Sequence, residues 1–213
     1  MTNGKNARQT MSKFTDEDWE SRIVNRKIEA IVIGASAGGI KALLMLLGKL
    51  PKHFQVPIII VVHMPETRES RLVEVFQHHM AIKVIVAEDK DHIVSERIYF
   101  ASSGYHLSIE LDRSFSVSCE APIHFSRPSI DVLMSSAADA YGASLLGVLL
   151  TGANQDGAEG MARINETGGL TVVQDPAEAE IAVMPQSALN LFTPDFIFPL
   201  QDIQALISRL ERC

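Results

Sequence analysis

The chain has 213 residues, of which 46% are hydrophobic, and this suits one α/β domain with a sizeable core. Its 19 Lys and Arg against 26 Asp and Glu give a net charge of −7 without a basic cluster, which argues against a nucleic-acid partner. The longest uninterrupted apolar run, over residues 56–62, is too short to cross a bilayer, and the polar start lacks a signal-peptide core. We therefore expect a cytoplasmic protein that does not insert into a membrane.

Cysteine usage narrows the chemistry further. The chain contains only Cys119 and Cys213, which is no disulfide framework. No Cys and His cluster has the spacing of zinc ligands, which argues against a structural zinc ion. We expect an activity that needs neither a metal ion nor another cofactor.

The first half of the chain predicts alternating strands and helices. Residues 1–27 are a polar N-terminal extension, and residues 16–29 have the apolar spacing of a short amphipathic helix. Short loops and strands rich in Val and Ile then favour a parallel sheet with helices on both faces. The predicted elements are strand 29–34, helix 38–48, strand 57–63, helix 66–79 and strand 82–86.

The second half begins with an antiparallel excursion of short strands at 97–101, 106–111 and 115–119, with a hairpin turn at residues 112–114. Alternation then resumes with helix 129–141, strand 145–150, helix 156–167, strand 170–174 and a closing helix over 201–211. The predicted fold over residues 28–213 is therefore a doubly wound α/β domain. Its sheet is mostly parallel, with helices on both faces and a small antiparallel hairpin.

Ser36 is the most informative residue, because it follows an apolar strand in the segment IVIGASAGG over residues 31–39. Flanking glycines allow a sharp turn, and the amides that open the next helix point at whatever lies over the serine. The segment from Gly34 to Gly38 also fits the G-x-S-x-G pattern of a nucleophile elbow. Such a serine requires a base and an orienting acid.

Two candidates for these partners also follow predicted strands. His63 comes after PIIIVV, and Asp156 lies in TGANQDG, after the strand over 145–150. The carboxyl ends of parallel strands share one sheet edge, so Ser36, His63 and Asp156 are expected to meet in one crevice as nucleophile, base and acid. Backbone amides after Ser36 and around Ala153 suit an oxyanion hole.

Each of these residues also has an ordinary structural interpretation. Ser36 suits the N-cap of the next helix, and His63 is one of seven histidines, any of which can end a strand. Asp156 and Glu159 match a capping box for the helix that follows. The coincidence of all three at one sheet edge favours the catalytic interpretation.

Two other enzyme classes fit less well. The glycines around Ser36 resemble a degenerate dinucleotide-binding turn, but serine replaces the middle glycine, and His63 stands where an acidic residue would bind ribose. An α/β-hydrolase would place its acid before its histidine in the chain. Here the order is Ser36, His63, Asp156.

Five segments in order carry a resemblance to a known family: IGASAGG at 33–39, VHMP at 62–65, RPSIDVL at 127–133, LTG at 150–152 followed by DGA at 156–158, and MPQSA at 184–188. They resemble the CheB-type chemotaxis protein-glutamate methylesterases, and the resemblance covers about residues 29–210. It implies that Ser36 is the nucleophile, His63 the general base and acid, and Asp156 its orienting partner. Amides around Ala37 and Ala153 would line the oxyanion hole.

The resemblance also implies a substrate. The reaction would be hydrolysis of γ-glutamyl methyl esters on the cytoplasmic helices of methylated chemoreceptors, with methanol released through an acyl-enzyme. Deamidation of receptor glutamines by the same chemistry is a second implied activity. The alternative is a non-catalytic signalling or scaffold module of the same fold that binds a receptor-like protein.

Three features depart from the family pattern. The family's usual enzyme carries an N-terminal receiver domain, which the segment before Glu29 is too short to contain, so we expect control by a separate regulatory protein or by residues 1–27. The family's Thr-Gly-Met-Gly loop is Thr151-Gly152-Ala153-Asn154 here. Its Ala-Pro-Gly turn is replaced by the segment from Ala101 to His106.

Overall fold

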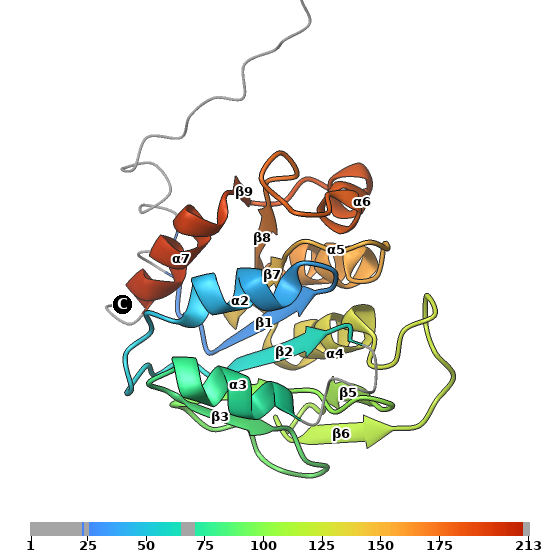
Figure 1. The fold of residues 1–213 in the computed structure, drawn as a ribbon. Coiled ribbons are helices and arrows are strands. Elements are labelled where there is room, and N and C mark those ends of the chain that lie inside the picture. Colours follow the sequence, from blue (N-terminus) through green and yellow to red (C-terminus); the bar gives the residue numbers. More distant parts are fainter. Residues whose placement is uncertain (1–22, 24–25, 65–70, 211–213) are drawn as a thin grey trace, which may run out of the picture.

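A seven-stranded sheet forms the centre of the protein, shown here by a computed structural model that describes residues 23, 26–64 and 71–210 (Figure 1). All neighbouring strands in it are parallel, in the order β3-β4-β2-β1-β7-β8-β9. Its three central strands are wholly buried, which explains their continuous runs of Ile, Val and Leu. The strands are β1 (Ala30–Ala35), β2 (Ile58–Val62), β3 (Lys83–Val86), β4 (Arg97–Phe100), β7 (Leu145–Leu149), β8 (Leu170–Gln174) and β9 (Phe196–Phe198).

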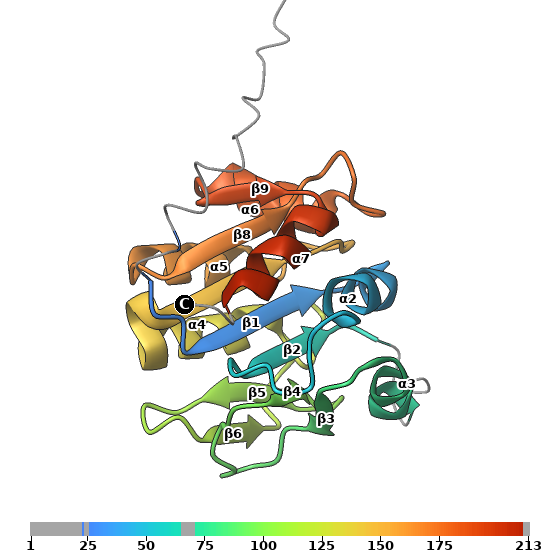
Figure 2. The ribbon, with the colours of Figure 1, turned by 90° about the vertical axis from the view of Figure 1, so that its left-hand side faces the viewer.

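Helices cover both faces of this sheet, as Figures 1 and 2 show. One face carries α2 (Gly39–Leu47), α3 (Leu72–His79) and α7 (Leu200–Arg209). The other carries α4 (Ile130–Tyr141), α5 (Ala158–Glu166) and α6 (Val183–Leu191), with the antiparallel pair β5 (His106–Ile109) and β6 (Phe115–Ser118) packed beside α4. A short 3-10 helix, η2 (Gly142–Ser144), leads into β7. The predicted doubly wound fold is thus confirmed.

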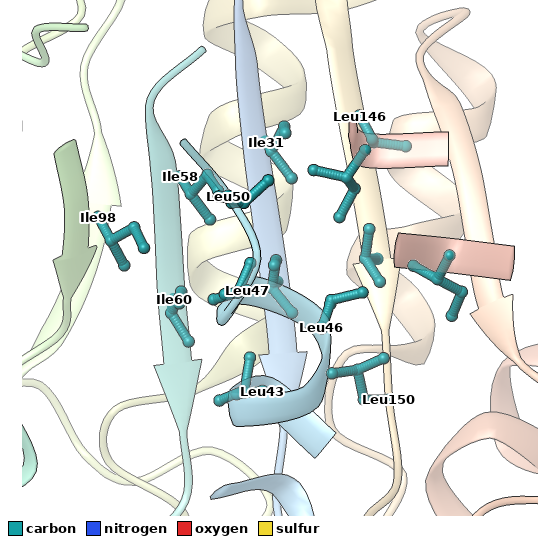
Figure 3. Close-up of a cluster of buried hydrophobic side chains, with 14 of the residues drawn as sticks. Ile31, Leu43, Leu46, Leu47, Leu50, Ile58, Ile60, Ile98, Leu146 and Leu150 are labelled. Carbon is teal, nitrogen blue, oxygen red and sulfur yellow. The ribbon is translucent and has the colours of Figure 1, made fainter. Parts of the chain in front are cut away.

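The core on the α2 face explains how that helix is held over the sheet. Leu43, Leu46 and Leu47 recur at the spacing of one helix face and are fully buried. Figure 3 shows them directed at side chains such as Ile31 and Ile60 on the central strands. This packing fixes the start of α2 relative to β1, and therefore the turn that contains Ser36.

On the opposite face, a glycine permits the close approach of α4 to β1. A Cβ atom added to Gly34 would lie 2.3 Å from the Cγ2 atom of Ile130, closer than real Cβ contacts allow. Any side chain at position 34 would therefore push the first turn of α4 away from the sheet. The glycine allows that turn to reach the loop after β7.

The observed elements differ from the predictions at several points. The strand predicted over 97–101 is not part of an antiparallel excursion: β4 is inserted in parallel between β2 and β3, and only β5 and β6 are antiparallel among the described strands. Helix α6 and strand β9 were not predicted. Most of the helix predicted over 16–29 lies outside the described residues. Within the described part, Ile23 is helical and buried in the core, but residues 26–29 are not helical. Helix α3 begins at Leu72, and residues 66–70 of the predicted helix are outside the described ranges.

Candidate active site

Three loops at the carboxyl edge of the sheet carry the predicted site residues. They follow β2, β1 and β7, which are neighbours in the sheet. Backbone hydrogen bonds join the loops: the His63 amide donates to the Ala35 carbonyl at 3.0 Å, and the Ser36 amide donates to the Thr151 carbonyl at 2.9 Å. The strand order also reverses at β1, which is where open parallel sheets bind ligands.

Ser36 occupies a turn between β1 and α2 and is not the helix N-cap. That position belongs to Gly38, which has a φ of 79° and provides no side-chain cap. A side chain at Gly38 would also approach the Cβ atom of Glu180 to 2.9 Å. The Ser36 carbonyl accepts a bond from the Gly39 amide at 2.7 Å, which closes the turn and leaves the hydroxyl half-exposed. The N-cap interpretation of Ser36 is therefore wrong.

Thr151 holds the loops around Ser36 together. Its hydroxyl donates to the Ala37 carbonyl at 2.9 Å and accepts from the Ile181 amide at 2.9 Å. Its own amide donates to the side chain of Gln174, at the end of β8, over 2.8 Å. In the sequence, Thr151 stands out only as part of a motif, and no local pattern indicates a role for Gln174. Both are buried and fix the walls of the site.

Asp156 is fully buried against the first turn of α4. One carboxylate oxygen accepts from the Ser129 hydroxyl at 2.8 Å and from the Asp131 amide at 3.0 Å, while the other accepts from the Ile130 amide at 2.8 Å. The N-cap of α5 is instead Gly157, without a side-chain bond. The alternative interpretation of Asp156 and Glu159 as a capping box for α5 is therefore wrong, because Asp156 instead accepts hydrogen bonds from the free amides at the start of α4.

These donors decide the charge of Asp156. Burial raises its pKa, but hydrogen bonds from His63, from the amides of Asp131 and Ile130 and from the Ser129 hydroxyl outweigh burial and lower the pKa to about 2. The positive end of the α4 helix dipole acts in the same direction. Asp156 is consequently a carboxylate near neutral pH.

His63 lies between this carboxylate and the loop that precedes α4. Its Nε2 atom is 2.9 Å from Oδ2 of Asp156, although the N–H bond is not well aligned with that oxygen. Its Nδ1 atom is 3.4 Å from the hydroxyl of Ser126. An ionised carboxylate only accepts hydrogen bonds, so Nε2 carries the proton and Nδ1 keeps the basic lone pair.

Ser36 and His63 line one pocket of about 670 Å³, together with Leu44, Met45 and Met64. Both residues are described, and no hydrogen bond joins the Ser36 hydroxyl to the imidazole. Catalytic hydrogen bonds are often long without substrate and tighten when it binds. The structure therefore places Ser36 and His63 at the same pocket, with His63 already in contact with Asp156.

The two amides expected for an oxyanion hole lie in the loops after β1 and β7, and of the two residues only Ala37 lines the pocket of Ser36. Ala37 follows Ser36 directly, and Ala153 lies in the loop after β7; both residues are exposed. Neither backbone amide hydrogen bonds to another described residue. Both N–H groups are therefore available to a ligand.

A second carboxyl group, which the sequence analysis did not single out, lies beside Asp156. Burial is the main cause that raises the pKa of Asp131 to about 7, and the neighbouring charge of Asp156 adds to it. One oxygen of Asp131 accepts from the Gly160 amide at 2.7 Å, while the other is buried without a hydrogen bond and lies 3.7 Å from Nε2 of His124. The two neighbouring aspartates thus favour opposite protonation states.

Within the described ranges, no group of three or more His, Cys, Asp or Glu side chains is arranged to hold a metal ion. Of the helices in the same part of the chain, none has the length and apolar character needed to span a membrane.

Comparison with known families identifies the family of this chain. The sequence model of the CheB methylesterase family matches residues 31–207, which include all three candidate residues. The chain belongs to the CheB methylesterase family. Its fold is also similar to the crystal structure of the Thermotoga maritima CheB methylesterase catalytic domain, with a TM-score of 0.81 and 28% identity over 86% of this chain and 98% of that one.

Relatives in this family differ in length. A Leptospira interrogans protein is 47% identical over 184 residues, which cover 86% of this chain and 95% of the relative. The Trichodesmium erythraeum protein-glutamate methylesterase/protein-glutamine glutaminase is 38% identical over 192 residues, which cover 89% of this chain but 54% of that protein. This chain therefore corresponds to nearly all of some relatives and to about half of others.

Proposed function

We propose that this member of the CheB methylesterase family is a serine hydrolase that removes methyl groups from γ-glutamyl esters on the cytoplasmic helices of chemoreceptors. The observation that carries the proposal is the contact of His63 with the buried carboxylate of Asp156, at the sheet edge and pocket that also present Ser36. The names of relatives supply the substrate class, protein glutamate esters.

In the proposed first half-reaction, the Ser36 oxygen attacks the ester carbonyl carbon while its proton passes to Nδ1 of His63. The negative charge that develops on the carbonyl oxygen is stabilised by the amides of Ala37 and Ala153. The imidazolium, held by Asp156, then gives its proton to the methoxy oxygen as the carbon–oxygen bond breaks. Methanol leaves, and the glutamyl group remains esterified to Ser36.

In the second half-reaction, water attacks this acyl-enzyme. His63 accepts one proton from the water and passes it to the Ser36 oxygen as the acyl bond breaks, which yields the free γ-carboxylic acid of glutamate. The acid then releases its remaining proton to water and leaves as a carboxylate. A glutamine side chain would enter the same cycle with ammonia as the leaving group. Deamidation therefore needs no additional residue, and relatives carry the glutaminase name as well.

The remaining parts of the proposal concern organisation. Residues 28–213 are proposed as the catalytic domain and residues 1–27 as an extension. The reaction as written uses only protein groups and water, so it requires no cofactor. We propose the methylated cytoplasmic domain of a chemoreceptor as partner, with control by a separate regulatory protein.

A labelling experiment separates this proposal from a non-catalytic module of the same fold. An activated serine reacts with a fluorophosphonate, so the protein should be labelled at Ser36 and the Ser36→Ala variant should not be. The control is Ser108→Ala, because Ser108 lies in β5 and its hydroxyl donates to the Ser116 carbonyl in the neighbouring strand β6. Methanol release from radiomethylated receptor membranes then tests the substrate. A parent protein that neither labels nor releases methanol would support the scaffold alternative.

A further inference from the structure

A second pocket, of about 460 Å³, adjoins the candidate active site and has no part in the proposed reaction. His63 lies in its wall, as it also lies in the wall of the pocket that contains Ser36. Much of the remaining wall comes from residues 122–128, in the loop between β6 and α4, which extends from the body of the protein in Figure 1. A ligand in this second pocket, named the Arg127 pocket below, would therefore lie beside the imidazole.

Arg127 gives this pocket its charge. Among the described residues that line it, Arg127 is the one with a full charge at neutral pH, and His63 is the other ionisable group. The Nη1 atom of Arg127 donates to the carbonyls of Cys119 and Glu120, each at 3.1 Å. These bonds hold the guanidinium against its own loop, but no carboxylate in the described part of the chain pairs with it. The charge is thus unpaired in a chain whose net charge is −7.

The rest of the guanidinium has donors without acceptors. The Nε atom is buried and makes no hydrogen bond, and Nη2 bonds to no other described residue. The N–H groups of Nε and Nη2 lie on one edge of the planar guanidinium, which matches the two oxygens of a carboxylate. Leaving such a donor buried without an acceptor is unfavourable. The pocket therefore lacks an anion of the kind that acidic side chains carry.

The tip of the same loop points to a polypeptide as the source of that anion. Phe125 also lines the Arg127 pocket, yet its side chain is fully exposed, with a relative accessibility of 104%. Its φ of 62° lies in the left-handed region, which is strained for a bulky residue and is kept mainly where a site requires it. An exposed aromatic ring beside an unpaired cation suits a partner with both apolar and acidic side chains. A small acid would need only the cation.

We propose that Arg127 binds an acidic side chain of the substrate polypeptide, so that esters one helical turn from a carboxylate are hydrolysed preferentially. The proposal rests on the function proposed above. Side chains three or four positions apart lie on one face of a helix, with Cβ atoms about 5–6 Å apart. A helix whose ester reaches Ser36 and His63 can therefore place its next side chain in the adjoining pocket. Arg127 takes no part in the bond changes and acts as a specificity residue.

The test uses two helical peptides, each with one γ-glutamyl methyl ester. One peptide has glutamates one turn before and one turn after the ester, and the other has alanines there. Fluorescence anisotropy measures their binding to Ser36→Ala, which leaves the esters intact, and methanol release measures their hydrolysis by the parent. The acidic peptide should bind about tenfold more tightly and have about tenfold higher kcat/KM.

Changes at Arg127 then test the origin of this preference. Arg127→Gln, added to Ser36→Ala for the binding measurement, should make the two peptides equivalent. Arg127→Lys should keep only part of the preference, because an ammonium group lacks the planar pair of donors. A looser loop in Arg127→Gln would weaken both peptides alike, so the ratio of the two affinities separates recognition from bracing of the loop. A preference that survives Arg127→Gln would overturn the proposal.

Two other cations are the controls. Lys41→Gln changes a lysine in the wall of the Ser36 pocket, and Arg163→Gln changes an exposed arginine that pairs with Asp139 on the surface. Both variants should keep the preference for the acidic peptide. Loss of the preference in Lys41→Gln would place the carboxylate in the other pocket and overturn the proposal.

The remaining outcomes separate this proposal from its alternatives. Free glutarate should not displace the acidic peptide at the concentrations at which that peptide binds; displacement there would assign the pocket to a small acid instead. Equal or undetectable binding of the two peptides would also overturn the proposal. If the parent hydrolyses both peptides at the same rate, the proposed function stands and the specificity of Arg127 fails. If it hydrolyses neither, the proposed function fails, and the binding ratio still decides whether Arg127 holds a carboxylate.

Discussion

Two histidine–aspartate pairs meet at the start of α4, and they differ in almost every property that matters for catalysis. Asp156 is surrounded by donors and lies 2.9 Å from His63, while Asp131 has one oxygen without a hydrogen bond and lies 3.7 Å from His124. Both carboxyls are buried, yet one pKa is lowered to about 2 and the other is raised to about 7. The number of donors, more than burial, therefore decides which aspartate can support a histidine as a carboxylate.

The largest expected effect distinguishes the two histidines. His63→Ala should reduce ester hydrolysis by several orders of magnitude, as should Ser36→Ala, because either change removes a group that acts as part of the proposed triad. His124→Ala, the matched change in the other pair, should stay within about tenfold of the parent. The rate of methanol release is compared between each variant and the parent, and circular dichroism verifies that each variant is folded. Equal losses in both histidine variants would show that the distinction between the pairs is wrong.

The second test exchanges each aspartate for asparagine. Asp156→Asn should lower turnover on the order of 10⁴-fold by favouring the wrong imidazole tautomer. It should also destabilise the fold by about 1–3 kcal/mol, because either orientation of the new amide points its NH₂ group at the amide of Ile130 or Asp131. Turnover and melting temperature are measured on the same protein. A variant that loses stability but keeps its rate would leave Asp156 with only its role at the α4 N-terminus.

Asp131→Asn should have a smaller effect, confined to the pH dependence of stability. Because the folded pKa of Asp131 is raised to about 7, the folded state binds this proton more tightly than the unfolded chain, and the stability it provides is lost as pH rises through about 7. The substituted amide resembles the neutral acid and removes that loss. Urea denaturation at about pH 5 and pH 8 should show a smaller difference for the variant than for the parent. Asp202→Asn, on the exposed start of α7, is the control and should leave the parent's pH dependence intact.

Asp156 should make the free energy of unfolding depend on pH in the opposite direction from Asp131. Its folded pKa is lowered to about 2, so the stability it contributes is present above its unfolded value of about 4 and is lost as pH falls toward 2. Asp156→Asn should flatten the acid side of the stability profile, whereas Asp131→Asn flattens the neutral side. Variants that flatten the same side would contradict the assignment of opposite protonation states.

The smallest expected effect is that of a chelator. Each histidine–aspartate pair supplies two groups of the kind that bind metals, but no third such ligand completes either pair in the described ranges. Incubation with EDTA should therefore leave methanol release unchanged. Loss of activity that a divalent metal restores would replace the serine mechanism with a metal-dependent one.

The placement of Ser36, His63 and Asp156 was predictable because each follows a strand whose apolar run is evident in the sequence. Parallel strands bring such loops to one edge without any knowledge of side-chain contacts. The order of the strands in the sheet was harder to predict from the sequence. Nothing local distinguishes β4 from the hairpin strands, since its pairing with β2 depends on residues about 40 positions away.

The surroundings of the three candidate residues could not be predicted from local sequence patterns. A cap for the helix that follows was the alternative interpretation of Asp156, but its backbone and hydroxyl partners are at positions 129–131. The Asn154 side chain likewise contacts Ser126 across 28 positions. Helix α6 was not predicted, although Pro185 lies in its first turn, where proline is tolerated. Long-range contacts thus determine the details that local spacing leaves open.

The bonds of Asp156 to the start of α4 bear on how this family can change over evolutionary time. An aspartate that completes the N-terminus of a core helix is retained by selection for folding, whether or not the protein still hydrolyses esters. Ser36 has no comparable structural role, since its side chain caps no helix and forms no hydrogen bond to another described group. In descendants that have lost activity, the serine should drift first and the aspartate should persist. If Ser36 is the nucleophile as proposed, the residue at position 36 should therefore separate active from inactive relatives.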